Sequence, residues 1–160
     1  MRMLLVIMFL GLTFIACDYA KEATELNPDI EITYMDPMGW YTVPGDTIAF
    51  ATIEETHFVA ENSMDCYLRE LIFEYYDKND NLIFQSEPLA LYAKINGKMS
   101  PTEADTFILY NVSLPLDTAV TYLTNNHLAS VKALLHYVAS DEYFDKYDTT
   151  TVWFGIYMFE

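Results

Sequence analysis

From Pro28 onward the chain is a series of short apolar runs separated by turn-forming residues. In the first run, Ile30, Ile32 and Tyr34 alternate with polar residues, and Asp36-Pro37 ends the run. A period of two places the apolar side chains on one face of a half-buried strand. Runs of this kind, with turn signals roughly every ten residues, predict an all-β domain.

The run Cys66–Asp77 gives the strongest strand signal. Leu71, Phe73 and Tyr75 share one face of it, and the polar turn 77–80 leads back into a partner strand. Asp and Asn bond their own backbone in such turns, so the sequence predicts a hairpin here. The other predicted strands are 47–56, 81–86, 89–95, 104–114, 130–139 and 150–159.

The connections between the runs carry their own signals. Pro44-Gly45-Asp46 predicts a turn before strand 47–56, in which we expect Ile48 and Phe50 to contact the core. Asn96-Gly97 predicts a second turn. These turns divide the chain into elements short enough for a two-layered β-domain.

The period of the apolar residues changes once, after Pro115. A short helix is expected there, with Asp117 able to cap its first turn and Asn125-Asn126 able to end it. Because a strand precedes and another follows, we expect the helix to cross between two sheets. The apolar residues at helical spacing are Leu116, Val120 and Leu123.

The segment YYDKNDNLI and the pair VKALLHYVAS and TVWFGIYMF combine aromatic-rich strands with polar turns. In this pattern residues 28–160 resemble the immunoglobulin-like and fibronectin type III-like modules of bacterial surface proteins. The resemblance implies an all-β, antiparallel immunoglobulin-like β-sandwich of roughly 7–8 strands with one short crossover helix. The Cys–Trp–Cys pattern of antibody domains is absent from the sequence.

The N-terminus reads MRMLLVIMFLGLTFIAC. Arg2 precedes an apolar run from Met3 to Phe14, and Ile15-Ala16 then lead to Cys17. The run is shorter than the about 20 apolar residues that span a bilayer, and its layout is that of a secretory signal peptide. FIAC stands where bacterial lipoproteins carry their lipobox, with Phe14 in place of the usual leucine, so the segment resembles a lipoprotein signal.

This resemblance implies that residues 1–16 are removed, that Cys17 is lipidated with acyl chains such as palmitate, and that residues 17–27 form a flexible tether. The protein is then expected to be exported and anchored to a membrane of the bacterial cell envelope. Asp18 resembles the inner-membrane retention signal of enteric bacteria. Because that rule does not hold in all bacterial lineages, the choice of membrane stays open. The alternative is an ordinary secretory signal that is cut elsewhere.

The charge of the chain restricts its partners. It has 24 acidic and 8 basic side chains, and removal of Arg2 with the signal leaves 7 basic ones. The negative electrostatic field of this excess of acidic side chains repels nucleic acid and anionic lipid headgroups, so we expect no nucleic-acid partner. If Cys17 is acylated, Cys66 has no partner within the chain, and we expect it to be buried as a small apolar residue.

Catalytic motifs are missing from the sequence: it has no nucleophile elbow, phosphate loop, zinc-protease motif or paired-cysteine metal motif. His57, His127 and His136 are scattered, and we expect them at the surface or at interfaces. Asp77, Asn79 and Asn81 copy the start of a calcium loop. Leu82 replaces its glycine and Pro88 its final glutamate, so an ion-free turn is predicted, with no metal and no cofactor.

The loop 141–148 is the candidate binding site. Tyr143, Phe144 and Tyr147 could stack on sugars or anchor a protein, and Asp141 and Asp145 could accept hydrogen bonds. The alternative, which we favour, is that these rings fold back over the open end of the core. Trp153 lies opposite the apolar face of the last strand and is expected to be partly exposed.

These features favour a non-enzymatic, lipid-anchored envelope protein that binds or spaces other proteins. The 13 Tyr, 10 Phe and 2 Trp residues support a carbohydrate-binding module as the alternative. That alternative predicts a flat row of exposed aromatic side chains. An enzyme acting on envelope polymers is the third hypothesis, and it is the weakest because the sequence carries no catalytic motif. It stays a hypothesis because an active site assembled in three dimensions need not leave a sequence motif.

Overall fold

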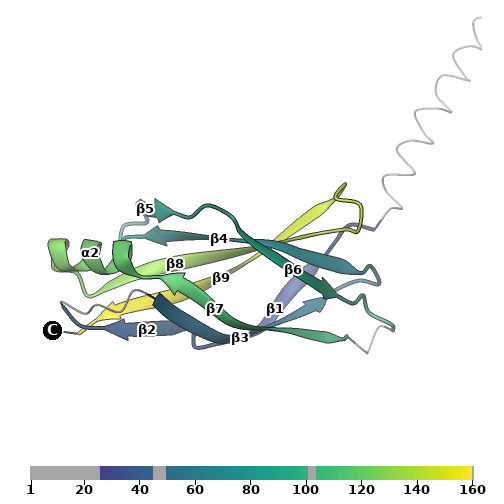
Figure 1. The fold of residues 1–160 in the computed structure, drawn as a ribbon, viewed down its shortest axis with the longest axis horizontal. Coiled ribbons are helices and arrows are strands. Elements are labelled where there is room, and N and C mark those ends of the chain that lie inside the picture. Colours follow the sequence, from purple (N-terminus) through teal and green to yellow (C-terminus); the bar gives the residue numbers. More distant parts are fainter. Residues whose placement is uncertain (1–25, 45–49, 101–103, 160) are drawn as a thin grey trace, which may run out of the picture.

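The structure is a computed structural model, and it describes residues 26–44, 50–100 and 104–159. Within these ranges the chain forms nine strands and one helix, arranged as an elongated body (Figure 1). The elements are β1 (Ile30–Asp36), β2 (Gly39–Thr42), β3 (Phe50–Ala60), β4 (Cys66–Tyr76), β5 (Leu82–Gln85), β6 (Leu89–Ile95), β7 (Thr106–Pro115), α2 (Asp117–Asn126), β8 (Ser130–Ser140) and β9 (Tyr147–Met158).

The strands form two sheets. One has the order β1-β3-β7, and the other has the order β2-β9-β8-β4-β5, with β6 also paired to β4. Strands β5 and β6 bond different halves of β4, so together they make one interrupted edge. The all-β prediction is confirmed, and the predicted hairpin after residue 76 is formed by β4 and β5.

The second sheet is mixed, which corrects the antiparallel prediction. Strand β2 runs parallel to β9, pairing Gly39 with Gly155 and Thr42 with Met158. Sequence reasoning missed β2 because it is only four residues long and has no room to show an alternating pattern. The chain passes from the first sheet to the second at the cis peptide bond Asp36-Pro37.

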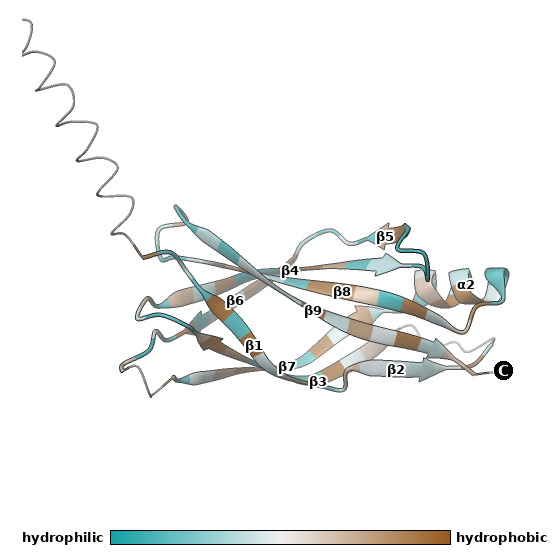
Figure 2. Ribbon diagram, turned by 180° about the vertical axis from the view of Figure 1, so that it is seen from behind, coloured by the Kyte–Doolittle hydropathy of each residue, from teal (hydrophilic) through white to brown (hydrophobic). Residues whose placement is uncertain are grey.

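A single apolar core lies between the two sheets. The hydropathy bands in Figure 2 alternate along the strands, and every second residue of β8 is buried. Phe58 of β3 meets Tyr137 of β8 edge to face, with ring centroids 4.9 Å apart, so the two layers are in contact. Each fully buried side chain of this size contributes about 1.5–3 kcal/mol through the hydrophobic effect.

Cys66 is fully buried, as predicted, and burial raises the pKa of its thiol. Of the two other core predictions, one is wrong and one concerns a residue outside the described ranges. Phe50 is 55% exposed, because β3 turns Ala51 and Ile53 inward instead. Ile48 lies outside the described residues.

The alternation predicted for the first strand is broken by an irregularity. The register of β1 on β3 shifts between Ile32 and Tyr34. After this bulge Tyr34 faces outward and Met35 is buried. A bulge of one residue reverses the faces of all the residues that follow it in the strand, which the sequence pattern alone did not reveal.

The helix α2 joins β7 of the first sheet to β8 of the second, as predicted. Its N-cap is Leu116, and Asp117 lies in the first turn without a capping bond from its side chain, which corrects the predicted cap. Ala119 and Leu123 are buried, so α2 closes one end of the core. No helix in the described ranges is both long enough and apolar enough to cross a membrane.

Candidate functional site

The loop between β8 and β9 is organised by its first residue, Asp141. The Asp141 carboxylate accepts hydrogen bonds from the backbone N–H groups of Asp145 at 2.9 Å and Lys146 at 3.4 Å, and its own N–H donates to the Lys146 carbonyl. Asp141 therefore stabilises the turn itself, which reduces what it can offer a ligand.

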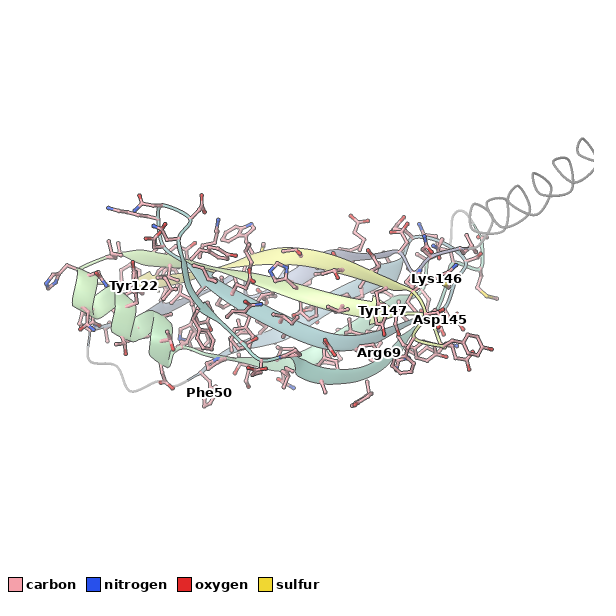
Figure 3. The ribbon with its side chains drawn as sticks, turned by 90° about the horizontal axis from the view of Figure 1, so that it is seen from above. Phe50, Arg69, Tyr122, Asp145, Lys146 and Tyr147 are labelled. Carbon is pink, nitrogen blue, oxygen red and sulfur yellow. The ribbon has the colours of Figure 1, made fainter. Side chains whose placement is uncertain are left out.

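Arg69 holds this loop from the neighbouring strand (Figure 3). It lies at a bulge of β4 and donates to the Ser140 hydroxyl at 2.8 Å and to the Asp141 carbonyl at 3.3 Å. Its guanidinium carbon lies 3.8 Å from the ring centroid of Phe144 and 4.9 Å from that of Tyr67. Sequence reasoning missed Arg69, although it is the only arginine after Arg2.

The three rings of the loop do not cover the core, which corrects the favoured expectation. Tyr143 is 75% exposed, Phe144 54% and Tyr147 57%. At this end of the domain the core is made of side chains from other elements. Those side chains are Ile30, Cys66 and Ile95, all of which are buried.

Beside the loop lies a cleft of about 290 Å³ lined by acidic and aromatic residues. Its lining combines Asp65, Tyr67, Glu142 and Tyr143 with Asp141 and Met64. Lys94, whose ammonium nitrogen is 2.5 Å from the Asp65 carboxylate, lowers the pKa of that carboxyl through a hydrogen bond, and the N–H of Gly97 adds to the effect. The charge of the Asp65 carboxylate in this cleft is therefore already compensated by Lys94.

The described chain begins at this same end of the domain. The Lys146 ammonium donates to the Leu26 carbonyl at 3.1 Å, and the N–H of Ile30 donates to the Asp148 carboxylate at 2.8 Å. Figure 3 places Lys146 and Tyr147 beside the start of the described chain. Cys17 and the rest of the predicted signal and tether up to residue 25 lie outside the described residues.

A second group of aromatic side chains follows the outer face of β9. We call it the β9 row, and it consists of Tyr147, Thr149, Thr151, Trp153 and Tyr157. The first four are exposed, and Trp153 is 48% exposed, which confirms its predicted partial exposure. Alternate residues of a strand point to one face, so these five side chains share the outer face of the mixed sheet.

The far end of the β9 row is built on two glycines. A Cβ atom on Gly155 would lie 2.3 Å from the Tyr157 hydroxyl, and one on Gly39 would lie 3.0 Å from the same ring. The Tyr157 ring therefore rests on bare backbone. Tyr41 stacks with Tyr157 at a centroid distance of 5.2 Å, and Phe159 stacks with Tyr41 at 5.0 Å.

A chain of polar side chains crosses the sheet beside Trp153. The His136 ring bonds the Thr151 hydroxyl through Nδ1 at 2.8 Å and the Glu74 carboxylate through Nε2 at 3.3 Å. Tyr76 donates to the same Glu74 oxygen at 2.5 Å and, with a smaller effect from His136, lowers the pKa of Glu74. Both nitrogens of the His136 ring are used within this chain, so the groups left for a polar ligand are the Thr151 hydroxyl and the second oxygen of Glu74.

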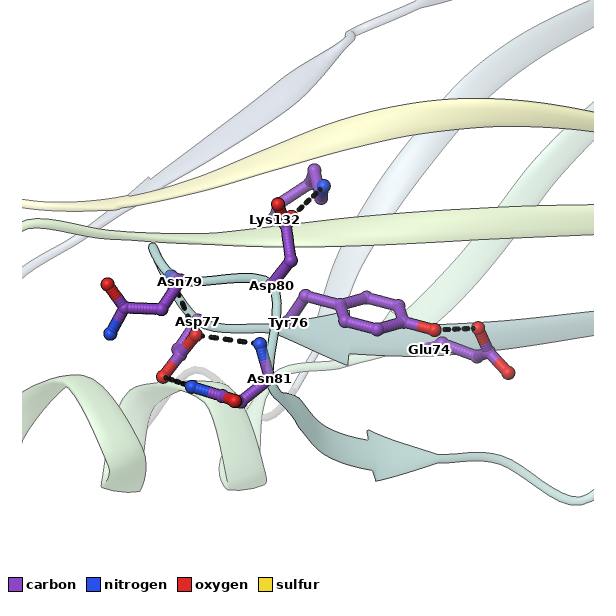
Figure 4. Close-up of polar contacts among 7 residues, drawn as sticks. All are labelled: Glu74, Tyr76, Asp77, Asn79, Asp80, Asn81 and Lys132. Atoms are coloured by element: carbon purple, nitrogen blue, oxygen red, sulfur yellow. Dashed lines mark hydrogen bonds and ion pairs between the residues drawn. The ribbon is translucent and has the colours of Figure 1, made fainter.

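The calcium-like segment is a self-contained turn (Figure 4). The Asp77 carboxylate accepts bonds from the N–H groups of Asn79 at 2.8 Å and Asn81 at 2.9 Å and from the Asn81 amide. These bonds lower the pKa of Asp77, led by those from Asn81. The predicted turn is confirmed. Across the described ranges, no group of three or more His, Cys, Asp or Glu side chains is placed to hold a metal ion.

The comparisons with known proteins are sparse. No family model matches the chain, and no curated protein matches it. One solved structure that resembles it is a crystal structure of a protein from Archaeoglobus fulgidus. The similarity has a TM-score of 0.43 and 8% sequence identity, and it covers 84% of this chain and 98% of the other.

Proposed function

We propose that this protein is a lipid-anchored, non-enzymatic binding module of the bacterial cell envelope, and that the β9 row is its recognition surface. The observation that carries the proposal is the row itself: exposed Tyr147 and Trp153, with Tyr157 beyond them, share one face of a sheet with two threonines. Exposed aromatic side chains that share one face with polar neighbours are typical of interaction sites.

We also propose that the domain has an immunoglobulin-like topology, which would suit a binding module and for which the strand orders give the following correspondence. Strands β1, β3 and β7 take the places of the first, second and fifth strands of that fold, and β9, β8 and β4 those of the seventh, sixth and third. The parallel pair β2–β9 then results from a first strand divided between the two sheets. Domains of this architecture bind ligands through loops or sheet faces that a rigid scaffold holds in place.

The proposed anchor is consistent with where the domain begins. Nine peptide units separate Cys17 from Leu26, which allows an extended tether of about 30 Å. Leu26 is next to the loop 141–148, and β9 runs from that loop to the opposite end of the body. With the anchor at this end, the β9 row would therefore extend away from the membrane, along the course of β9 that Figure 1 shows.

The anchor is tested by replacing Cys17 with serine in the full chain. The wild-type protein is expected to incorporate labelled palmitate and to enter the detergent phase on partitioning, whereas Cys17→Ser is expected to do neither. Labelling that is unchanged by the substitution contradicts the anchor.

The recognition surface is tested by photo-crosslinking in the native host. A photoreactive phenylalanine analogue replaces Trp153 in one full-length variant and Phe50, an exposed ring on the other sheet, in the control. We expect a discrete adduct, whatever its chemical class, from position 153 and none from position 50. Equal yields from the two positions would refute the proposed surface.

A further inference from the structure

We infer that the β9 row binds an extended, uncharged glycan chain, with Trp153 as the stacking platform and the Thr151–His136–Glu74 chain as the hydrogen-bonding wall. This inference rests on the proposed function and names the class of its ligand. It rests on the exposed ring of Trp153, on the polar chain beside it and on the position of β9 within the sheet.

The platform is a half-exposed indole on the outer face of the mixed sheet. Trp153 pairs across the sheet with Leu134 of β8, which is half-buried and supports it on one side. A pyranose ring has a face of C–H groups and a rim of hydroxyls. An indole held on a sheet can pack against that face, while polar neighbours contact the rim.

The polar neighbours are within one strand of the platform. Thr151 is two residues from Trp153 on the same face, and His136 is paired opposite Thr151. Adjacent strands lie about 4.8 Å apart, so the Thr151 hydroxyl, which the His136 ring orients, is placed at the rim of a sugar ring stacked on Trp153. Both bonds to Glu74 end on Oε2, and its other oxygen lies outside this chain of contacts.

The spacing of the rings favours a polymer over a single sugar. At about 3.4 Å per residue, the backbone of Tyr147 lies about 20 Å from that of Trp153 along β9. On the other side of Trp153, the Tyr157 ring is folded back over Gly155. Exposed rings at this separation on one strand can contact different units of an extended chain. The threonines between Tyr147 and Trp153 continue the hydroxyl-bearing surface along the same face.

The position of β9 argues against a peptide strand as the ligand. It lies between β2 and β8, so its backbone hydrogen bonds are already used within the sheet. A ligand can reach only its side chains, and strand addition requires an exposed edge. The net charge of −16 opposes an anionic polymer and so, among glycans, favours a chain without acidic sugars, of which we take the uncharged class as the ligand.

The test uses the full chain in detergent micelles and three uncharged probes: cellohexaose, chitohexaose and mannohexaose. A hexasaccharide of hyaluronan serves as the anionic control. In a Trp40→Phe background Trp153 is the only tryptophan, and we expect at least one uncharged probe to change its emission saturably. Calorimetry on the wild-type chain gives the same affinity independently of that background.

The matched variants are Trp153→Ala, Thr151→Val and Phe50→Ala, each checked for folding by circular dichroism. We expect Trp153→Ala to weaken binding at least about tenfold, Thr151→Val to weaken it severalfold and Phe50→Ala to leave it unchanged. Binding that survives Trp153→Ala, or equal binding of the anionic control, overturns the inference.

The failure of this inference can be distinguished from failure of the proposed function. If none of the uncharged probes binds but position 153 crosslinks to a protein in the envelope, the glycan is wrong and the recognition surface stands. If no probe binds and position 153 gives no adduct, both are wrong.

Discussion

Arg69 illustrates how a single side chain fixes a loop that is distant in sequence. The bulge of β4 frees it from the regular alternation, and its two hydrogen bonds and its stacking on Phe144 join β4 to the loop 141–148. The sequence identified the loop and its aromatic residues. It could not identify the clamp, because a bulge is not visible in an alternating pattern.

Arg69→Lys tests this clamp. Lysine keeps the charge but loses the planar group that stacks on Phe144 and the geometry that bonds two acceptors. We expect a loss of about 1–2 kcal/mol in unfolding free energy and faster proteolysis within residues 141–148. Lys94→Arg, which preserves an ion pair outside the loop, is the control. Unchanged proteolysis in Arg69→Lys would show that the loop is held by other contacts.

The buried tyrosines provide a second test at the residue scale. The Tyr137 and Thr56 hydroxyls are both buried without a hydrogen-bond partner of normal geometry, although Thr56 slightly opposes the effect of burial on the pKa of Tyr137. The Tyr75 hydroxyl instead donates to the Pro115 carbonyl. We expect Tyr137→Phe to change the unfolding free energy by less than about 0.5 kcal/mol and Tyr75→Phe to cost about 1–2 kcal/mol. Urea unfolding of both variants measures the difference, and equal losses contradict it.

Tyr137 also makes a prediction about alkaline pH. Burial raises its pKa from 10.0 to about 12, so the folded state favours the neutral phenol. Its contribution to stability is complete below pH 10 and is lost as the pH rises towards 12. Tyr137→Phe is therefore expected to move the midpoint of alkaline unfolding upward. A midpoint that does not move would assign alkaline unfolding to other groups.

At the scale of elements, the sequence predicted most strands and the helix because their periodicity is long and clean. It failed where a local irregularity changes the face of a strand, as at Tyr34, or where a strand is as short as β2. The β9 row was not predicted as a unit, because the sequence placed Tyr147 in the loop 141–148 and Trp153 in the strand 150–159. Its significance required the sheet order, since only that order shows which face is left open.

Gly155→Ala tests the packing of β2 on β9. The added methyl group would overlap the Tyr157 ring and push it away from its stack with Tyr41. We expect a loss of about 1–3 kcal/mol in the unfolding free energy, measured by thermal denaturation. Adding Tyr157→Leu should recover part of this loss, because the clashing ring is then absent. If the double variant is additive, the clash is not with Tyr157.

At the scale of the whole molecule, the two candidate surfaces lie at different places on the elongated body. The loop 141–148 is beside the start of the described chain, whereas the β9 row extends from it towards the far end (Figure 1). The sequence directed attention to the loop because its acidic and aromatic residues are contiguous. The structure shows that Asp141 and Phe144 are used to hold that loop together.

The recognition surface is tested most directly by hydroxyl-radical footprinting of the protein in native envelopes and after purification. We expect oxidation of Trp153 to fall severalfold in envelopes, because the ligand covers it there. Phe50 and Tyr92, which are exposed on other strands, should be oxidised equally in both samples. Equal oxidation of Trp153 in both samples would mean that nothing binds over the β9 row, and the proposed recognition surface would be wrong.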